Sequence, residues 1–145
     1  MKVLVWIAAS LVVMVVLVVV IGWLLPVGHE ASVSRVFAQP PEVLYRLIAD
    51  RDEYPQWWSG DPRIKSDVLQ ATPSRRFVTR IADPEQPFGG TWTFDIVADG
   101  TGSRVTITER GEVYNPVFRL VSRFVLGHHA TMNGFLDAAA ERLNQ

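Results

Sequence analysis

Residues 3–25 read VLVWIAASLVVMVVLVVVIGWLL, and this apolar stretch divides the chain into two parts. It contains no charged residue and one hydroxyl group, that of Ser10. A helix rises about 1.5 Å per residue, so a helix of this length spans about 35 Å and can cross the roughly 30 Å apolar core of a bilayer. Trp6 and Trp23 lie near its two ends, where indole rings favour the headgroup region. The sequence therefore predicts a transmembrane anchor and linker over residues 1–28.

The flanking charges predict an orientation. Lys2 and the terminal amino group precede the stretch, and no Lys or Arg follows until Arg35. The positive-inside bias then places the N-terminus in the cytoplasm, so we expect a single-pass protein of the cell membrane with an extracytoplasmic domain. A cleaved signal peptide usually has a shorter apolar region of about 7–15 residues. A buried core helix would need more surrounding chain than residues 29–145 provide.

The composition of residues 29–145 excludes several classes of function. With Lys2 set aside, the 15 acidic residues outnumber the basic ones, so no basic stripe is available for nucleic acid. The chain contains no cysteine, which excludes disulfides, thiolate catalysis and Cys-ligated zinc. We see no serine-nucleophile motif, phosphate loop or paired-carboxylate signature, and we expect no cofactor or metal.

The periodicity of residues 29–60 predicts a strand and then a helix. Residues 31–38 alternate as in a strand, with Val33 and Phe37 on one side. Pro40-Pro41-Glu42 then opens a helix, since proline suits the first turn and an acid there meets the positive end of the helix dipole. A polar break follows the helix and leads to the pair Trp57-Trp58.

The following residues predict an antiparallel meander. Its strands are expected over residues 64–71, 76–82, 91–98 and 103–113. Asp99-Gly100-Thr101-Gly102 is typical of a tight hairpin, because glycine supplies the positive φ angle such a turn needs. Gly89-Gly90 is expected at a loop tip.

The last segment, residues 116–143, predicts one long helix. Glycine lowers helix propensity, so a kink or a close approach is expected near Gly127. The apolar stripe of this helix consists of Val121, Phe124, Val125, His128, Met132, Phe135, Leu136, Ala139 and Leu143.

This order of elements, with Pro-Pro-Glu-Val at residues 40–43 and Tyr-Pro-Gln-Trp-Trp at residues 54–58, resembles the SRPBCC superfamily. The superfamily is also called START-like or Bet v 1-like, and the match is closest to its polyketide cyclase/dehydrase and lipid-transport group. The resemblance implies an α+β helix-grip domain over residues 29–145, in which a curved antiparallel sheet wraps around a long C-terminal helix and leaves a cavity for an apolar ligand. It implies no shared catalytic set, because the chemistry of this superfamily varies with the cavity residues.

A helix lying across the concave sheet would enclose one interior volume, so we expect a lipophilic pocket with the tryptophan pair near its mouth. The same side chains could instead pack as a dry core. No residue is predicted to be catalytic. The expected ligand-binding residues are Trp57, Trp58, Phe77, Trp92, Phe94, Ile107, Glu109, Phe124, His128, Met132 and Phe135.

Glu109 and His128 are the polar members of this set. They could form a buried pair that orients a polar ligand group or moves a proton. Alternatively, His128 is structural and Glu109 pairs with Arg80 or Arg110, or faces solvent. We expect no metal site at His128-His129, because adjacent helical side chains point about 100° apart.

Three classes of function fit the sequence. The first is a membrane-tethered domain that binds or transfers a lipid or other hydrophobic small molecule. The second is an enzyme of the polyketide cyclase/dehydratase type, which would require Glu109 or His128 to face the pocket. The third is an interaction module with a filled core. We favour the first, because an anchor keeps a carrier beside a lipophilic ligand.

Overall fold

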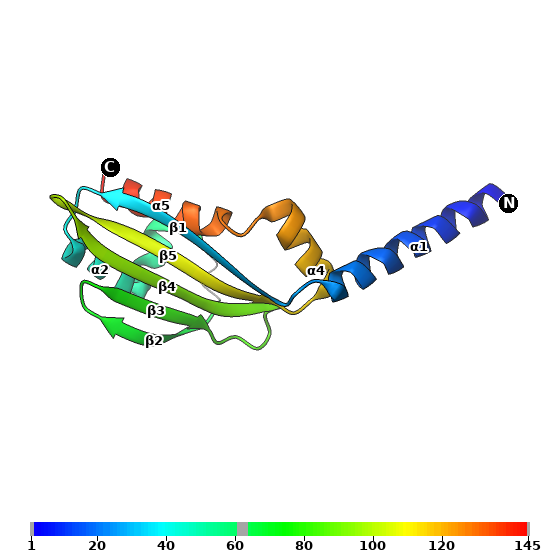
Figure 1. Ribbon diagram of the computed structural model, residues 1–145, viewed down its shortest axis with the longest axis horizontal. Helices are drawn as coiled ribbons and strands as arrows, with labels where there is room; N and C mark the ends of the chain where they lie inside the picture. The colour runs from blue at the N-terminus through cyan, green and yellow to red at the C-terminus, as the bar shows by residue number, and fades with distance from the viewer. Residues whose placement is uncertain (1, 61–63, 145) are drawn as a thin grey trace.

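The computed structural model describes residues 2–60 and 64–144, apart from the side chain of residue 126. In this part of the chain an antiparallel sheet of five strands has the order β1-β5-β4-β3-β2. Helices cover one face of the sheet, and α1 projects from one end (Figure 1). The strands are β1 (Gly28–Phe37), β2 (Ser66–Thr72), β3 (Arg76–Ile81), β4 (Phe88–Asp99) and β5 (Gly102–Val113). The helices are α1 (Lys2–Leu24), α2 (Pro41–Ala49), η1 (Arg51–Glu53), α3 (Tyr54–Trp57), α4 (Pro116–Val121), η2 (Ser122–Leu126) and α5 (Ala130–Arg142).

The expected strands are all present in the described chain, but two begin three residues earlier than predicted. β1 begins at Gly28 and β4 at Phe88. Gly89 and Gly90 therefore lie inside a strand, and the prediction of a loop tip is wrong. The physical reason is a close approach of two backbones: Gly90 has a φ of 120°, and a Cβ there would lie 2.2 Å from the carbonyl oxygen of Arg110 on β5. The hairpin between β4 and β5 is confirmed, since Asp99 pairs with Gly102 across the turn.

Helix α2 begins at Pro41, as the sequence predicts, because proline in the first turn loses no helical hydrogen bond. Leu44 and Ile48 lie one turn apart on its inner side, and both are buried against the sheet. The two short helices η1 and α3 then turn the chain. Arg51 of η1 donates a 2.7 Å hydrogen bond to a carbonyl at the start of β2, which fixes this turn to the sheet.

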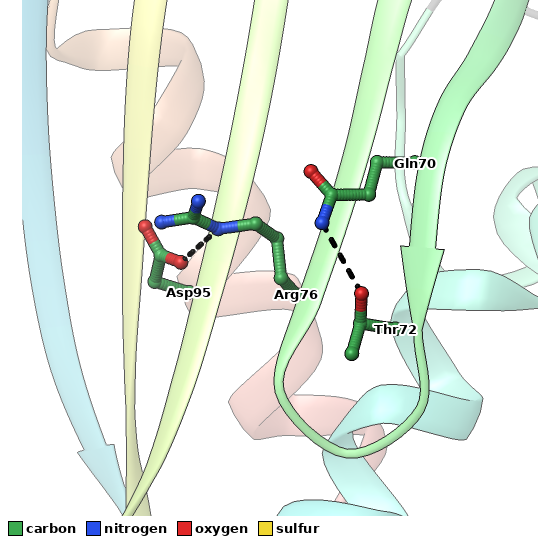
Figure 2. Close-up of polar contacts among 4 residues, drawn as sticks. All are labelled: Gln70, Thr72, Arg76 and Asp95. Carbon is green, nitrogen blue, oxygen red and sulfur yellow. Dashed lines mark hydrogen bonds and ion pairs between the residues drawn. The ribbon is translucent and has the colours of Figure 1, made fainter.

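The two faces of the sheet differ in polarity. The face that α2 and α5 cover carries the buried side chains of Phe94 and Ile107, which are paired across β4 and β5. The opposite face carries polar pairs: Arg76 donates a 2.6 Å hydrogen bond to Asp95, and a Gln–Thr hydrogen bond lies nearby on β2 (Figure 2). An apolar ligand is therefore to be sought on the helix-covered face.

The C-terminal segment is not the single helix expected over residues 116–143. Helix α4 passes into η2, a π-helical turn, and α5 begins at Ala130. Between them Gly127 has a φ of 71°, a conformation that glycine reaches without strain. The expected irregularity at Gly127 is confirmed, but it is a complete break. Helix α5 lies along the sheet, whereas α4 lies beside the end of α1 (Figure 1).

Among the described residues, α1 is the one helix long and apolar enough to cross a membrane. It meets the domain at its C-terminal end, where Gly22 packs against Pro116. The buried guanidinium of Arg119 donates hydrogen bonds to the carbonyl oxygens of Gly22 (3.1 Å) and Leu25 (2.8 Å). The same group donates to the carbonyl oxygen of Val113 at 2.9 Å, so Arg119 joins α1, β5 and α4.

Candidate functional site

The candidate site lies on the helix-covered face, at the end of the sheet nearest α1. Trp92 of β4 pairs with Glu109 of β5, and in the next row Gly111 of β5 pairs with His29 of β1. Residues paired across antiparallel strands point to the same face. Trp92, Glu109 and His29 therefore share the face of the buried Ile107.

These side chains form one cluster with His128, which follows the turn at Gly127. His29 Nε2 lies 3.5 Å from Glu109 Oε1. The rings of His29 and His128 are stacked, with centroids 3.7 Å apart and planes 19° from parallel. The indole N–H of Trp92 acts as a donor toward the Glu109 carboxyl and lowers the pKa of that group. We call His29, Trp92, Glu109 and His128 the Glu109 cluster.

The cluster unites the two polar residues that the sequence singles out, but it does so through a third residue. His29 lies between Glu109 and His128: its Nε2 faces the Glu109 carboxyl, and its ring stacks on that of His128. Arg80 and Arg110, the alternative partners of Glu109, form ion pairs with other glutamates. Sequence reasoning missed His29 because it began the first strand at residue 31. Continuing the alternation of that strand by one more step would have placed His29 on the inner face.

A glycine makes room for this arrangement. A Cβ on Gly111 would lie 2.2 Å from Cε1 of His29 and 3.0 Å from Oε1 of Glu109. Any side chain at residue 111 would therefore push the imidazole away from the carboxylate. The absence of a side chain at this position of β5 gives the His29 ring its place over the sheet.

Burial decides the charge state of the cluster. It raises the pKa of the Glu109 carboxyl, although His128 and the Trp92 hydrogen bond partly oppose this rise. Burial also lowers the pKa of both His29 and His128. The positive charge of Arg123 lowers the pKa of His29 further, and His29 has the same effect on the pKa of His128. Neutral imidazoles beside such a carboxyl can donate and accept hydrogen bonds, and they can exchange a proton with a bound group.

Aromatic side chains occupy the space between the sheet and α5, next to the Glu109 cluster. Phe135 of α5 is the centre of this group. Its ring centroid lies 5.0–5.9 Å from those of Tyr54, Trp57, Trp58, Trp92 and Phe94. The tryptophan pair is half-buried and packs on the core. The buried Nε1 of Trp57 has no hydrogen-bond acceptor among the described residues.

The predicted binding residues fall into three groups. The buried core contains Phe77, Phe94, Ile107, Met132 and Phe135, and the half-buried Trp57, Trp58 and Trp92 pack against it. Glu109 and His128 belong to the Glu109 cluster. Phe124 lies outside both, because η2 and the break at Gly127 turn it away from the sheet and leave it 66% exposed. The prediction that Phe124 faces the interior is wrong.

Two surface hollows of the described chain lie away from this site. One runs along α1, and the other lies between α2 and the end of α5. Within residues 2–60 and 64–144, no group of three or more His, Asp or Glu residues is placed to hold a metal ion. Between the sheet and α5, a ligand would have to contact or displace the aromatic side chains.

The histidines predict a pH dependence of stability. Because the pKa of His128 is lower in the folded protein than its ordinary value of 6.5, the unfolded chain binds more protons below that pH. The free energy of unfolding should then fall as the pH falls from 7 to 5.5. The contribution of Glu109 has the opposite sign, because a raised carboxyl pKa favours the folded state as the pH falls.

We expect His128→Gln to reduce the slope of the free energy of unfolding against pH. The reduction is at most about 1.4 kcal/mol per pH unit, which is the largest contribution that the binding of one proton can make. The comparison variant is His129→Gln, which replaces an exposed neighbour that acts on His128 and Glu109 through its charge, and it should change the slope less than His128→Gln does. Urea titrations at several pH values measure the slope. An unchanged slope in His128→Gln would show that the fall comes from other groups.

The curved antiparallel sheet, the helix along its concave face and the aromatic interior define a helix-grip domain. Residues 37–134 match the family described as "Polyketide cyclase / dehydrase and lipid transport". The chain belongs to this family. Membership indicates a domain that binds hydrophobic ligands. No protein with a curated description matches the sequence.

Solved structures share the fold. A START superfamily protein from Mycobacterium smegmatis is 17% identical, with a TM-score of 0.62 over 81% of this chain and 98% of that chain. Protein MLL2253 from Mesorhizobium loti is 16% identical, with a TM-score of 0.61 over 80% and 97%. The di-domain ARO/CYC StfQ from the steffimycin biosynthetic pathway is 15% identical, with a TM-score of 0.60 over 82% and 53%. At these identities the likeness establishes the fold alone.

Proposed function

We propose that this protein is a membrane-anchored domain that binds a lipid or other hydrophobic small molecule between the sheet and α5. Residues 1–28 serve as anchor and linker, and residues 29–145 as the binding domain. The observation that carries the proposal is the position of the Glu109 cluster at the edge of the aromatic interior. The apolar body of a ligand would lie against Trp58, Trp92 and Phe135, and its polar end would bind Glu109 and the two histidines.

Entry of a ligand requires the tryptophan pair to move. Trp57 ends the four-residue helix α3 and Trp58 follows it, so their displacement disturbs little regular structure. A ligand that lies between the displaced rings and Phe135 replaces the apolar contacts that they give up, and an acceptor on it can bind Nε1 of Trp57, which has no acceptor in the closed form. Both effects favour exchange between a closed form and a loaded form.

The anchor and its orientation belong to the same proposal. Helix α1 places the domain beside a reservoir of hydrophobic molecules, with the N-terminus in the cytoplasm and the domain outside. A reporter that is active only outside the cytoplasm should therefore work when it is fused to the C-terminus. Activity of a cytoplasm-only reporter at that end would reverse the orientation.

The binding site is tested by Glu109→Gln, with Glu112→Gln as the matched control. Both residues lie on β5, but Glu112 points to the opposite face and lies 3.9 Å from Arg80. Lipids that bind to α1 should be extracted equally from the wild type and from both variants, so they form a constant background. A molecule held in the domain should be lost from Glu109→Gln by about tenfold or more, as expected for one hydrogen bond to a charged group, and retained in Glu112→Gln.

Mass spectrometry of organic extracts from the gently purified protein measures this difference. Equal extracts from all three proteins would contradict binding at Glu109. They would favour the interaction module with a filled core, which the dense aromatic packing around Phe135 also suits.

A second candidate is an enzyme of the cyclase/dehydratase type. The observation that favours it is a carboxyl of raised pKa beside two imidazoles, a set that can remove a proton at one atom and return it at another. In that case the wild-type extract should contain two forms of the ligand that differ by one water, and the small fraction that Glu109→Gln retains should contain one form. A single form in both proteins would leave the binding function alone.

A further inference from the structure

Among the described residues of the domain, the two most exposed large apolar side chains are neighbours in sequence. Phe124 and Val125 of η2 are 66% and 72% exposed, and Val117 of α4 is 42% exposed. We call these three residues the η2 surface. Two exposed side chains that are adjacent in sequence cost solvation free energy that a soluble domain normally avoids. Their position therefore calls for a partner.

This surface is fixed to the end of α1. Arg119 of α4 is 7% exposed, and its guanidinium binds carbonyl oxygens at the C-terminal end of α1, where the helix dipole is negative. A Cβ on Gly22 would lie 2.1 Å from the carbonyl oxygen of Pro116, so the two helices touch backbone to backbone. Helix α4 leaves this junction crosswise to α1 (Figure 1). The η2 surface therefore stays near the level at which α1 ends.

The residues at that level suit a membrane interface. Trp23, at the end of α1, is 73% exposed, and aromatic side chains favour the headgroup region. The exposed Arg123, next to Phe124, can reach lipid phosphates while its stem lies along apolar surface. Aromatic, aliphatic and basic side chains together are typical of segments that lie in the plane of the interface.

We infer that the η2 surface inserts into the interfacial layer of the bilayer that α1 spans, and so docks the end of the domain nearest α1 against the membrane. The inference rests on the anchor proposed above. Helix η2 leads through Gly127 directly to His128, so docking brings the Glu109 cluster to the membrane surface. A lipophilic ligand could then pass between bilayer and domain without crossing water.

The chain contains no cysteine, so a single introduced cysteine reports one position. The environment-sensitive fluorophore NBD is attached to the cysteine of the Val125→Cys variant of the full-length protein. The labelled protein is then reconstituted in phosphatidylcholine/phosphatidylglycerol vesicles, and its fluorescence is compared with and without doxyl-labelled lipid, which quenches NBD inside the bilayer. Val15→Cys in α1 reports the anchor. Val97→Cys, which is 56% exposed near the β4–β5 hairpin remote from α1, is the aqueous control (Figure 1).

Quenching by doxyl lipid at residue 125 should be at least threefold stronger than at residue 97. Quenching at residue 15 without quenching at residue 125 would overturn the inference and leave the anchor intact. No quenching at residue 15 would overturn both. Protection of residue 125 from a water-soluble quencher without quenching by doxyl lipid would also overturn it, since a second protein copy would then cover the surface.

Discussion

Truncation of Phe135 to alanine is expected to lower the free energy of unfolding by about 3–5 kcal/mol. The side chain is 0% exposed, and five aromatic rings surround it between the sheet and α5. Its removal leaves a cavity that these large, rigid rings cannot close. Urea titration of the full-length protein in mild detergent, followed by near-ultraviolet circular dichroism, measures the change.

The matched control is Phe124→Ala, which removes the same side chain from the same predicted helical stripe. Phe124 is exposed in the structure, so its truncation should change the free energy of unfolding by no more than about 0.5 kcal/mol. Equal losses in the two variants would mean that Phe124 packs in the interior, as one continuous helix would place it. That result would contradict the break at Gly127.

Arg119→Met is expected to lower the free energy of unfolding by about 2–4 kcal/mol, the second of the two largest effects. Methionine keeps much of the aliphatic stem but removes every donor, so the carbonyl oxygens of Val113, Tyr114, Gly22 and Leu25 lose a partner. Part of the lost free energy comes from the hydrogen bonds that attach α1 to the domain. The variant should therefore also make the domain more mobile relative to α1.

Arg110→Met serves as the control for the loss of a positive charge. Arg110 forms an exposed ion pair with Glu30 at 2.9 Å, and such pairs contribute at most about 1 kcal/mol. The same urea titrations compare the two variants. If the free energy of unfolding falls by the same small amount in both variants, Arg119 does not hold α1 against α4. The argument that the η2 surface is fixed to the end of α1 then fails as well.

The sequence predicted most of the fold because its local signals agree with the final packing. Proline at residues 40 and 41 marks the start of α2, and Asp99 with Gly100 marks the central hairpin. Alternation on β4 and β5 identifies Phe94 and Ile107 as inner residues. Signals of this kind are read within a few residues and need no knowledge of distant contacts.

The errors concern residues whose role depends on distant parts of the chain. Gly90 reads as a loop residue, yet it is required by the close approach of β5. Arg119 lies outside the apolar stripe predicted for residues 116–143, yet it is buried because α1 supplies carbonyl oxygens to it. His29 joins Glu109 only through the register of β1 on β5, which periodicity alone does not give.

The central claim is that a hydrophobic molecule binds between the sheet and α5, and photo-cross-linking tests it most directly. The full-length protein is reconstituted in nanodiscs with a photoactivatable fatty acid, irradiated and digested, and the adducts are mapped by mass spectrometry. The account predicts adducts on Trp57, Trp58 or residues of α5, in addition to those on α1, and their loss in Glu109→Gln but not in Glu112→Gln. Adducts confined to α1 and η2 would contradict it, because the lipid would then touch the outside of the protein alone.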